Sequence, residues 1–337
     1  MLLNRINPFK KIYDQCNLGD PANRYQHPLD FPRFLDIEIT NHCNFNCLMC
    51  PVGTKVMNRT RGFMDKELYN RIIDEIKAYK TPIRFIRWGE PMLHKEFFNF
   101  LKKAKESGIM CHLNTNGSLF TEETLKKIVE LGIESIKFSF QGIDKKSYFE
   151  MRNRDFFDEL MNTVKRLYDL RGEREFPYIH IASTITYESQ QQVDAFKDAA
   201  KHFADLVTVG RTKMEHIDVK KIRLSEEEKE RFTFLKEQES LAKLHFNCCP
   251  EVFDKLSINW DGKVTACCGD YDNMMIVGDL RENTLKEIWN SEKLNHYRKL
   301  LSQRRYDEIK LCKTCYDTMG IQTSQARSLA DSINKTS

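Results

Sequence analysis

The chain has 337 residues, 41% of them apolar, which is enough for one large domain or a large and a small one with a sizeable core. Its 53 basic and 49 acidic residues leave a net charge of +4, and no basic arm or stripe predicts a nucleic-acid partner. No apolar run reaches the ~18 residues of a transmembrane helix, and no signal-type segment is evident. We therefore expect a cytoplasmic protein without a membrane partner, in which eleven cysteines favour metal binding or catalysis over disulfides.

Short β-rich runs alternate with segments of helical period through the first two thirds of the chain. Asp65 is suited to cap the first helix, and Thr121 and Gly132 are suited to bracket the third. Because a crossover helix lets successive strands run parallel, six such runs predict a parallel sheet, either a partial barrel or a doubly wound sheet. The expected strands are 35–40, 83–88, 110–114, 135–140, 178–185 and 206–210, and the expected helices are 65–78, 97–104, 122–131, 156–170 and 191–203.

The alternation stops after about residue 212. A long charged helix is expected over 225–242, followed by a β-hairpin with a type I′ turn at Asp261-Gly262 and by two short helices. We accordingly divide the chain into an N-terminal extension (1–32), an α/β core (33–212), a helical linker (213–245), a small cysteine-rich domain (246–320) and a loose tail (321–337).

The first cysteine group, Cys43-Asn-Phe-Asn-Cys47-Leu-Met-Cys50, directly follows the first expected strand. Ligands gather at the carboxyl ends of parallel strands, and this spacing brings three thiolates of one loop around a common point. Three thiolates leave one iron of a [4Fe–4S] cluster open, where the amino and carboxylate groups of S-adenosylmethionine (SAM) can bind. A zinc knuckle completed by His42 is the alternative.

A CxxxCxxC sequence after the first strand of a six-fold βα pattern resembles the radical SAM superfamily, over residues 33–212. The resemblance implies an α/β fold with a partial (β/α)6 barrel and an external one-electron reductant such as flavodoxin or ferredoxin. It also implies that the reduced cluster cleaves SAM to a 5′-deoxyadenosyl radical, which takes hydrogen from carbon. The SAM contacts that it implies are Met49 at the adenine, Gly89, Glu90 and Pro91 in a segment like the family's GGE, Asn116 in a T-N-G sequence, and Ser139 and Arg152 at the ribose or carboxylate.

Two positions depart from the family pattern. Trp88 stands where the first glycine of the GGE segment usually stands, so either a free backbone is not required there or the tryptophan packs over the cofactor. Gln141 replaces the acid of the family's S-x-D-G sequence. Strand position alone puts four further side chains at the mouth of the barrel: Arg87, His112, His180 and Arg211.

The second cysteine group contains two doublets and a C-x2-C pair. Counted from Cys249, the spacing is C-x12-G-x4-C, with Gly262 in the hairpin turn and Cys267 at its end. This pattern resembles the SPASM extension of radical SAM enzymes, which carries auxiliary iron–sulfur clusters. The C-x2-C pair is not followed by further cysteines, so the resemblance implies a truncated or twitch-like form with one auxiliary [4Fe–4S] cluster, held by Cys249, Cys267, Cys312 and Cys315. Cys248 in place of Cys249, and a zinc ribbon in place of the cluster, are the alternatives.

These motifs imply a radical SAM enzyme that oxidises or epimerises a small molecule such as a sugar, an aminocyclitol or a similar polyol. An auxiliary cluster ligated entirely by protein has no open iron, which favours electron transfer over substrate binding. In an epimerase, Cys248 and Cys268 are candidate hydrogen donors. The alternative function is that of a peptide-modifying maturase, which the short stretch before the first strand and the single auxiliary set disfavour. The sequence assigns no catalytic residue.

Overall fold

The computed structural model of the chain describes residues 5–16, 21–186, 188–213 and 251–315, with 219–221, 225–227, 229–230, 233 and 249 between the last two. The expected helix 225–242 is described at only a few positions. Cys248 and the expected tail 321–337 lie outside the described residues.

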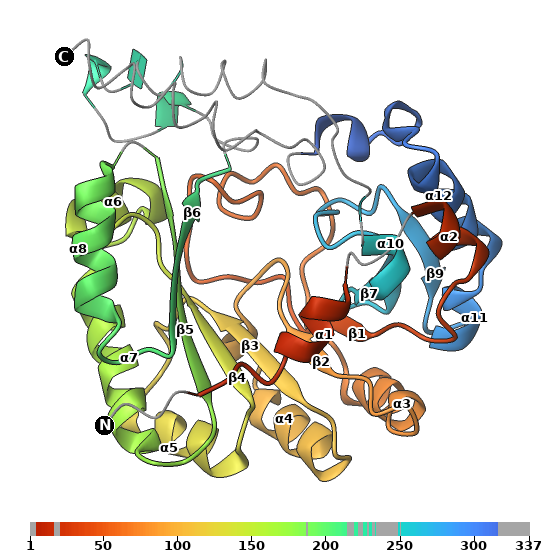
Figure 1. The fold of residues 1–337 in the computed structure, drawn as a ribbon, viewed down its shortest axis with the longest axis horizontal. Helices are drawn as coiled ribbons and strands as arrows, with labels where there is room; N and C mark the ends of the chain where they lie inside the picture. The colour runs from red at the N-terminus through yellow and green to blue at the C-terminus, as the bar shows by residue number, and fades with distance from the viewer. Residues whose placement is uncertain are drawn as a thin grey trace.

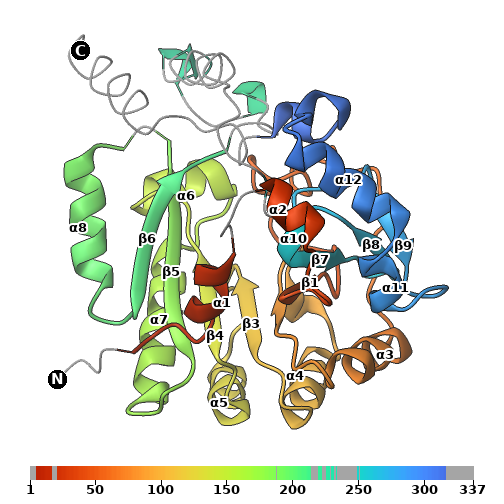
Figure 2. The same ribbon diagram turned by 45° about the vertical axis from the view of Figure 1, so that its right-hand side comes forward.

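One nine-stranded sheet organises the molecule, in the order β6-β5-β4-β3-β2-β1-β7-β8-β9 (Figures 1 and 2). Neighbours from β6 to β7 are parallel, and β8 and β9 are antiparallel to their neighbours. Strands β1 to β6 follow one another without reversal, which defines a partial barrel rather than a doubly wound sheet and confirms the predicted α/β fold. The strands are β1 (Phe34–Ile37), β2 (Ile83–Phe85), β3 (Cys111–Thr115), β4 (Ser135–Ser139), β5 (Tyr178–Ile185), β6 (Leu206–Arg211), β7 (Lys255–Ile258), β8 (Lys263–Thr265) and β9 (Ile276–Asp279).

The helices between the strands cover the outside of this sheet (Figure 1). The Asp65 carboxylate caps α3 by accepting a 2.7 Å hydrogen bond from the Leu68 amide, as predicted. The helices are α1 (Lys10–Gln15), α2 (Pro21–Gln26), α3 (Lys66–Ile76), α4 (Phe97–Glu106), α5 (Glu122–Leu131), α6 (Lys145–Arg152), α7 (Phe157–Arg171), α8 (Gln190–Ala200), α10 (Glu251–Asp254), α11 (Leu285–Trp289) and α12 (Glu292–Ser302), with 3₁₀ turns η1 (Pro91–Leu93), η2 (Val219–Lys221), η3 (Tyr306–Glu308) and η4 (Cys312–Thr314). None of the described helices is long and apolar enough to cross a membrane.

Side chains alternate between the two faces of the sheet, so that those on the outer face join the apolar core and those on the inner face form a polar surface. Ile37, Phe85 and Leu113 are fully buried in the apolar core. Asp36 on β1 instead accepts hydrogen bonds of 2.6 and 2.9 Å from the Arg84 guanidinium of β2. This buried ion pair lies inside the barrel, below the carboxyl ends of the strands.

Helix α1, from the N-terminal extension, lies against this polar inner face (Figure 2). Phe9 is fully buried beside it, with its ring centroid 5.7 Å from that of His112. The Arg84 guanidinium lies 5.8 Å from the ring centroid of Tyr13 and donates a hydrogen bond to its hydroxyl. The extension therefore covers the amino-terminal side of the barrel and leaves the carboxyl ends of the strands for ligands.

The predicted hairpin extends the barrel sheet, because β7 pairs in parallel with β1. The predicted type I′ turn is wrong. Asn259 pairs with Lys263 across a three-residue turn, in which Gly262 has a φ of +93° and its amide bonds to the Asn259 carbonyl. A type I′ turn needs a positive φ at Asp261 as well, which this residue does not have. Trp260, whose Nε1 donates to the Thr60 carbonyl at 3.3 Å, is held in the turn.

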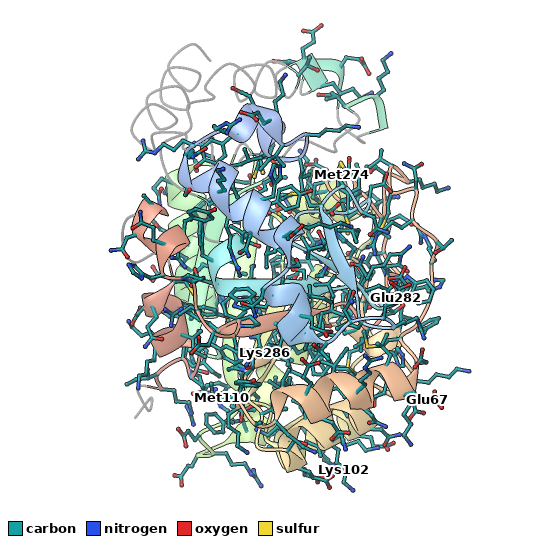
Figure 3. All side chains as sticks on the ribbon, turned by 90° about the vertical axis from the view of Figure 1, so that its right-hand side faces the viewer. Glu67, Lys102, Met110, Met274, Glu282 and Lys286 are labelled. Atoms are coloured by element: carbon teal, nitrogen blue, oxygen red, sulfur yellow. The ribbon has the colours of Figure 1, made fainter. Side chains whose placement is uncertain are left out.

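The C-terminal region also packs against the barrel helices. Glu75 of α3 accepts hydrogen bonds of 3.0 Å from the backbone amides of Leu285 and Lys286, which begin α11. Figure 3 shows this side of the molecule, with α3 carrying Glu67 and α11 carrying Lys286. The domain limits expected from the sequence remain predictions. The sheet continues from the expected α/β core into the expected cysteine-rich domain, and the Glu75 hydrogen bonds join the same two regions.

Candidate functional site

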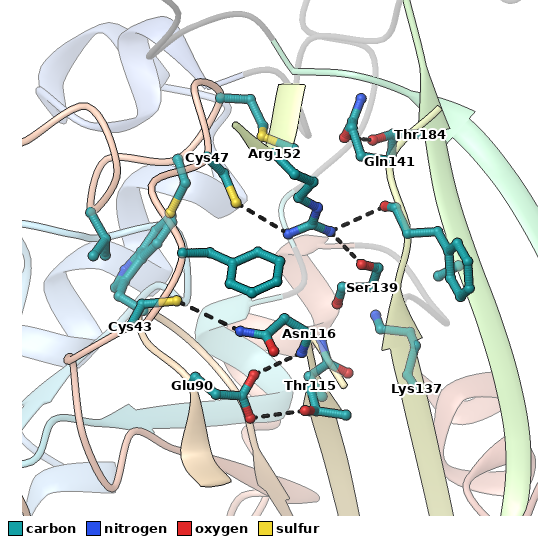
Figure 4. A pocket seen from close by; sticks show the side chains of 18 of the residues that line it. Cys43, Cys47, Glu90, Thr115, Asn116, Lys137, Ser139, Gln141, Arg152 and Thr184 are labelled. Atoms are coloured by element: carbon teal, nitrogen blue, oxygen red, sulfur yellow. Dashed lines mark hydrogen bonds between the residues drawn. The ribbon is translucent and has the colours of Figure 1, made fainter. Parts of the chain in front are cut away.

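A cavity of about 410 Å³ lies at the carboxyl ends of the barrel strands (Figure 4). The carboxyl-terminal parts of β1 to β6 or the segments that follow them contribute to its lining, and its size lies in the range of small-molecule sites. Pro91 does not line it, because this residue begins the buried turn η1. The other residues predicted to bind the first cluster and SAM do line it: Cys43, Cys47, Cys50, Met49, Gly89, Glu90, Asn116, Ser139 and Arg152.

The three thiols of the first group all face this cavity. Burial raises the pKa of Cys43 to about 12 and the pKa of Cys50 to about 11. Deprotonation of these thiols to the thiolates that bind iron therefore requires the positive charge of the metal itself. Arg152 donates to the Cys47 sulfur at 3.4 Å, and the Asn116 amide lies 4.0 Å from the Cys43 sulfur. His42, the proposed fourth ligand of a zinc knuckle, stacks on the Phe63 ring instead, at 4.7 Å.

The segment after β2 packs tightly against the loop after β1. Gly89 has a φ of +127°, and a Cβ atom there would lie 2.4 Å from the Thr40 carbonyl oxygen and 2.8 Å from that of His42. Only glycine fits this close approach. The next amide, of Glu90, donates to the His42 carbonyl at 2.8 Å. The backbone thus sets Glu90 directly beside the cysteine loop.

Three hydrogen bonds hold the buried Glu90 carboxylate in place. It accepts hydrogen bonds from the Thr115 hydroxyl at 2.8 Å, the Asn116 amide at 2.7 Å and the Met92 amide at 3.1 Å. Burial raises the pKa of Glu90 to about 7, although these bonds oppose the shift. A carboxylate has about four lone-pair positions, so one stays available in the cavity. That position suits an ammonium group such as that of SAM.

Arg152 reaches the same space from the end of α6, which Asp144 caps through the Ser147 amide. Its Nη2 donates to the backbone carbonyls of Ser139 at 2.6 Å and Phe140 at 3.2 Å. Its Nε is buried without a hydrogen-bond partner among the described residues. This unpartnered donor, at a cavity also lined by three thiols and Glu90, fits a bound group that carries a carboxylate.

The structure accounts for both departures from the family pattern. Trp88 lines the cavity and donates from Nε1 to the Asp270 carbonyl at 3.3 Å, so its indole joins the cavity to the loop after β8. Gln141 donates to the Thr212 hydroxyl and accepts from the Thr184 hydroxyl, both at 2.6 Å. Through these two bonds the Gln141 amide ties the ends of β5 and β6 together.

The structure brings the auxiliary cysteines near one another. Burial raises the pKa of Cys249, and the nearby Glu251, Cys312 and Cys315 raise it further. The Cys268 thiol and burial, with a smaller effect of Cys249, raise the pKa of Cys267. Within the described part of the chain, no three His, Cys, Asp or Glu side chains converge closely enough for a single metal ion. A four-iron cluster does not require such convergence, because each thiolate binds a different iron.

Comparison with known families agrees with this geometry. Residues 37–209 match the model of the radical SAM superfamily, and residues 248–316 match that of the SPASM iron–sulfur cluster-binding domain. The chain belongs to the radical SAM superfamily and carries a SPASM or twitch-type auxiliary domain. Its cofactors are accordingly SAM, the [4Fe–4S] cluster that binds it, and an auxiliary iron–sulfur cluster.

Individual relatives are distant in sequence, but their matches cover most of both chains. A tungsten-containing aldehyde ferredoxin oxidoreductase cofactor-modifying protein of Pyrococcus furiosus is 24% identical, over 83% of this chain and 87% of the relative. The S-adenosyl-L-methionine-dependent 2-deoxy-scyllo-inosamine dehydrogenase of Niallia circulans is 22% identical, over 86% of this chain and 95% of the relative. The crystal structure of BtrN in complex with AdoMet and 2-DOIA has a TM-score of 0.54 at 20% identity and covers 85% of this chain and 93% of that chain.

Three residues of the site were not predicted from the sequence: Thr115, Lys137 and, beside Lys137, Asn114. Thr115 stands in the T-N-G sequence but was not assigned a contact, and it is the hydroxyl that holds Glu90. Lys137 lies inside the expected strand 135–140 and lines the cavity. The sequence signal that could have identified Lys137 is a lysine within an otherwise buried parallel strand. Of the side chains expected at the barrel mouth, Arg87 and Arg211 line the cavity, whereas His112 and His180 lie outside its lining.

Proposed function

We propose that this protein is a radical SAM oxidoreductase that acts on a small polyol-like molecule, such as a sugar or a cyclitol, as a dehydrogenase or an epimerase. The observation that carries the proposal is that the three thiols, Glu90 and Arg152 all line one and the same cavity, which has the size of a small-molecule site. The extent of the match to a dehydrogenase of a cyclitol amine supports it.

The residues of the chain have separable tasks in this proposal. The Cys43, Cys47 and Cys50 thiolates would hold the cluster, and Arg152 would keep the Cys47 sulfur in place through its 3.4 Å contact. Glu90 would bind the SAM ammonium group with its remaining lone pair. When bound, the cluster and SAM supply a 5′-deoxyadenosyl radical, generated with an electron from a flavodoxin or ferredoxin of the cytoplasm, that can take hydrogen from carbon.

Oxidation of a carbinol carbon to a ketone removes one hydrogen atom, one proton and one electron. An epimerisation removes one hydrogen atom and returns another to the opposite face, so it needs no net electron acceptor. The auxiliary site formed by Cys249, Cys267, Cys312 and Cys315 would hold the acceptor that only the first reaction requires. The two reactions therefore differ in their need for the auxiliary cluster.

Deuterium transfer tests the proposal. The anaerobically reconstituted protein would be incubated with SAM, a reductant and carbon-deuterated sugars, cyclitols and their phosphates and acids. We expect deuterium in 5′-deoxyadenosine with at least one of these compounds, and none with the triple variant Cys43→Ala, Cys47→Ala, Cys50→Ala. Deuterium transfer only from peptides would contradict the proposal and favour a maturase.

The double variant Cys312→Ala, Cys315→Ala separates the two reactions. In a dehydrogenase, hydrogen abstraction should continue while the yield of ketone falls sharply. In an epimerase whose donor is an independent thiol, turnover should be less affected. Circular dichroism must show that the variant stays folded, because loss of a metal site can unfold a small domain. Undiminished ketone formation by the folded variant would rule out the auxiliary cluster as electron acceptor.

A further inference from the structure

Lys137 has a position that the proposed cofactors leave unexplained. It lies on β4 between Asn114 of β3 and His180 of β5 in the register of the sheet, and it lines the cavity below Ser139 (Figure 4). Neither a hydrogen bond nor an ion pair joins its ammonium group to any other described residue. A largely enclosed ammonium group without a partner is costly, so it marks a place where an anion would be stabilised.

The other charges of the inner face balance without Lys137. Asp36 pairs with Arg84 and Lys255, and Lys255 also pairs with Glu251 at 2.8 Å, which gives two anions for two cations. Both histidines near Lys137 are neutral at physiological pH, because burial lowers the pKa of His112 to about 3 and that of His180 to about 4. Among the described residues of this face, Lys137 is therefore a positive charge without a paired anion.

The rest of the cavity lining does not supply the missing anion. Among the described lining residues the only carboxylate is Glu90, which is engaged by Thr115 and Asn116. The position where the family carries an acid holds the neutral Gln141, whose amide is itself bonded. The other charged residues of the described lining are all cations: Arg87, Arg152, Arg211 and Lys213. With Glu90 taken by SAM, an amine-bearing substrate would find no carboxylate partner among the described lining residues.

Asn114 adds a second donor beside Lys137. Its Oδ1 lies 2.8 Å from Nε2 of His112, which donates this bond in the neutral ring. Its amide nitrogen is then the group that can donate to a ligand, and Asn114 also lines the cavity. An ammonium group and an amide N–H group on adjacent strands form a pair of donors suited to an oxyanion.

We propose that Lys137 and Asn114 bind a carboxylate or phosphate group of the substrate, so that the substrate is a polyol-like anion and not an amine-bearing cyclitol. This inference rests on the proposed function, since it specifies the substrate of the same cavity. It places the charged group of the substrate deep in the barrel and leaves the reacting carbon nearer the cysteine loop.

Calorimetric titration of the reconstituted protein with SAM, under anaerobic conditions and in chloride buffer, tests the site directly. The probes are inorganic phosphate and acetate, which distinguish the two oxyanions, with additional chloride at equal ionic strength as the reference. We expect wild-type protein to bind at least one oxyanion more tightly than chloride. Lys137→Met should weaken this binding about tenfold or more, as for loss of a charged hydrogen bond.

Two further variants make the result decisive. Lys137→Arg keeps the charge and should retain most of the affinity. Lys201→Met removes the same charge from an exposed position paired with Asp198 and should change nothing. Absence of oxyanion binding by wild type, equal binding by Lys137→Met, or equal losses in the Met and Arg variants would overturn the inference. Anion binding needs no radical, so its failure is distinguishable from failure of the deuterium-transfer test.

Discussion

Arg87 donates a 2.6 Å hydrogen bond from Nη2 to the backbone carbonyl oxygen of Asp270, and this bond joins the candidate SAM-binding segment to the loop that follows Cys267. Arg87 has a φ of +113°, an uncommon conformation for a residue with a side chain, so the surrounding contacts must hold it. The Trp88 indole donates to the same carbonyl. The segment after β2 and the loop after β8 thus meet at one peptide oxygen.

The Asp270 side chain should be essential for the stability of this loop. Its buried carboxylate accepts hydrogen bonds from the Thr265 hydroxyl and from the amides of Asp272, Met274 and Met275. Asp270→Asn replaces one acceptor oxygen with a donor, so we expect a loss of about 2–4 kcal/mol of unfolding free energy and a lower auxiliary iron content. Urea unfolding and iron analysis measure both, with the exposed Asp307→Asn as control. A variant that matches wild type in both measurements would show that the carboxylate is dispensable.

The iron content should reflect two separate clusters. Reconstituted wild type should hold about eight irons, four in each cluster. The triple variant Cys43→Ala, Cys47→Ala, Cys50→Ala should hold about four and should cleave no SAM. Cys16→Ala, in neither cysteine group, should keep the full content. About four irons in wild type, or stoichiometric zinc, would contradict this prediction.

Glu90→Gln should weaken SAM binding about tenfold or more, by loss of a charged hydrogen bond. The glutamine amide nitrogen must replace either Oε1, which accepts from the Met92 backbone amide, or Oε2, which accepts from the Asn116 backbone amide, so in either orientation a donor faces a donor. Equilibrium dialysis measures the affinity, and the iron content should not change. The exposed Glu106→Gln is the matched control. Wild-type affinity in the Glu90 variant would remove this residue from the SAM site.

Asp36→Asn should destabilise the barrel by about 3–5 kcal/mol at pH 7, because it removes the carboxylate that pairs with the buried Arg84 and leaves Lys255 with Glu251 as its remaining anion. Although burial opposes the shift, these two cations hold the pKa of Asp36 well below its usual range. A folded-state pKa below the unfolded value means that this stabilisation is complete above about pH 4 and is lost as the pH falls further.

Urea unfolding at pH 7 and near pH 3 measures this difference between wild type and Asp36→Asn. The difference should shrink at the lower pH, whereas Asp307→Asn should match wild type closely at pH 7. A gap that stays constant between the two pH values would count against a pH-linked role of the carboxylate.

The oxyanion affinity of the cavity should fall as the pH rises through about 8. Burial, with a further effect of Arg84, lowers the pKa of Lys137 to about 8. Below this value the amine carries the charge that binds the anion, and above it the amine is neutral. The titratable groups that face it from the neighbouring elements are Asp36, Arg84, His112, His180, Lys255 and Cys268.

Calorimetry between about pH 6.5 and about pH 9.5, a range that spans the pKa of Lys137, measures this fall in affinity. Lys137→Arg stays charged throughout and should show no comparable loss. Parallel pH profiles for wild type and the Arg variant would assign the pH dependence to another group.

Local sequence signals predicted much of the fold. The helix expected over 122–131 has those bounds, because Thr121 and Gly132 act at its two ends through contacts within a few residues. The strand expected over 83–88 ends instead at Phe85, since Arg87 and Gly89 take positive φ values to form the candidate SAM-binding segment. Helix α6, which carries Arg152, was missed because few of its residues are apolar.

The sequence by itself determined the cysteine spacing, the alternation of strands and helices and the family to which the chain belongs, because each depends on residues close together in the chain. Only the tertiary structure decided that β7 pairs with β1, more than two hundred residues away. It also decided that Asp36 takes Arg84 and Lys255 as partners, while Lys137 has no partner among the residues that the structure describes. Such pairings depend on which side chains the closed barrel brings to one face, and no local pattern specifies them.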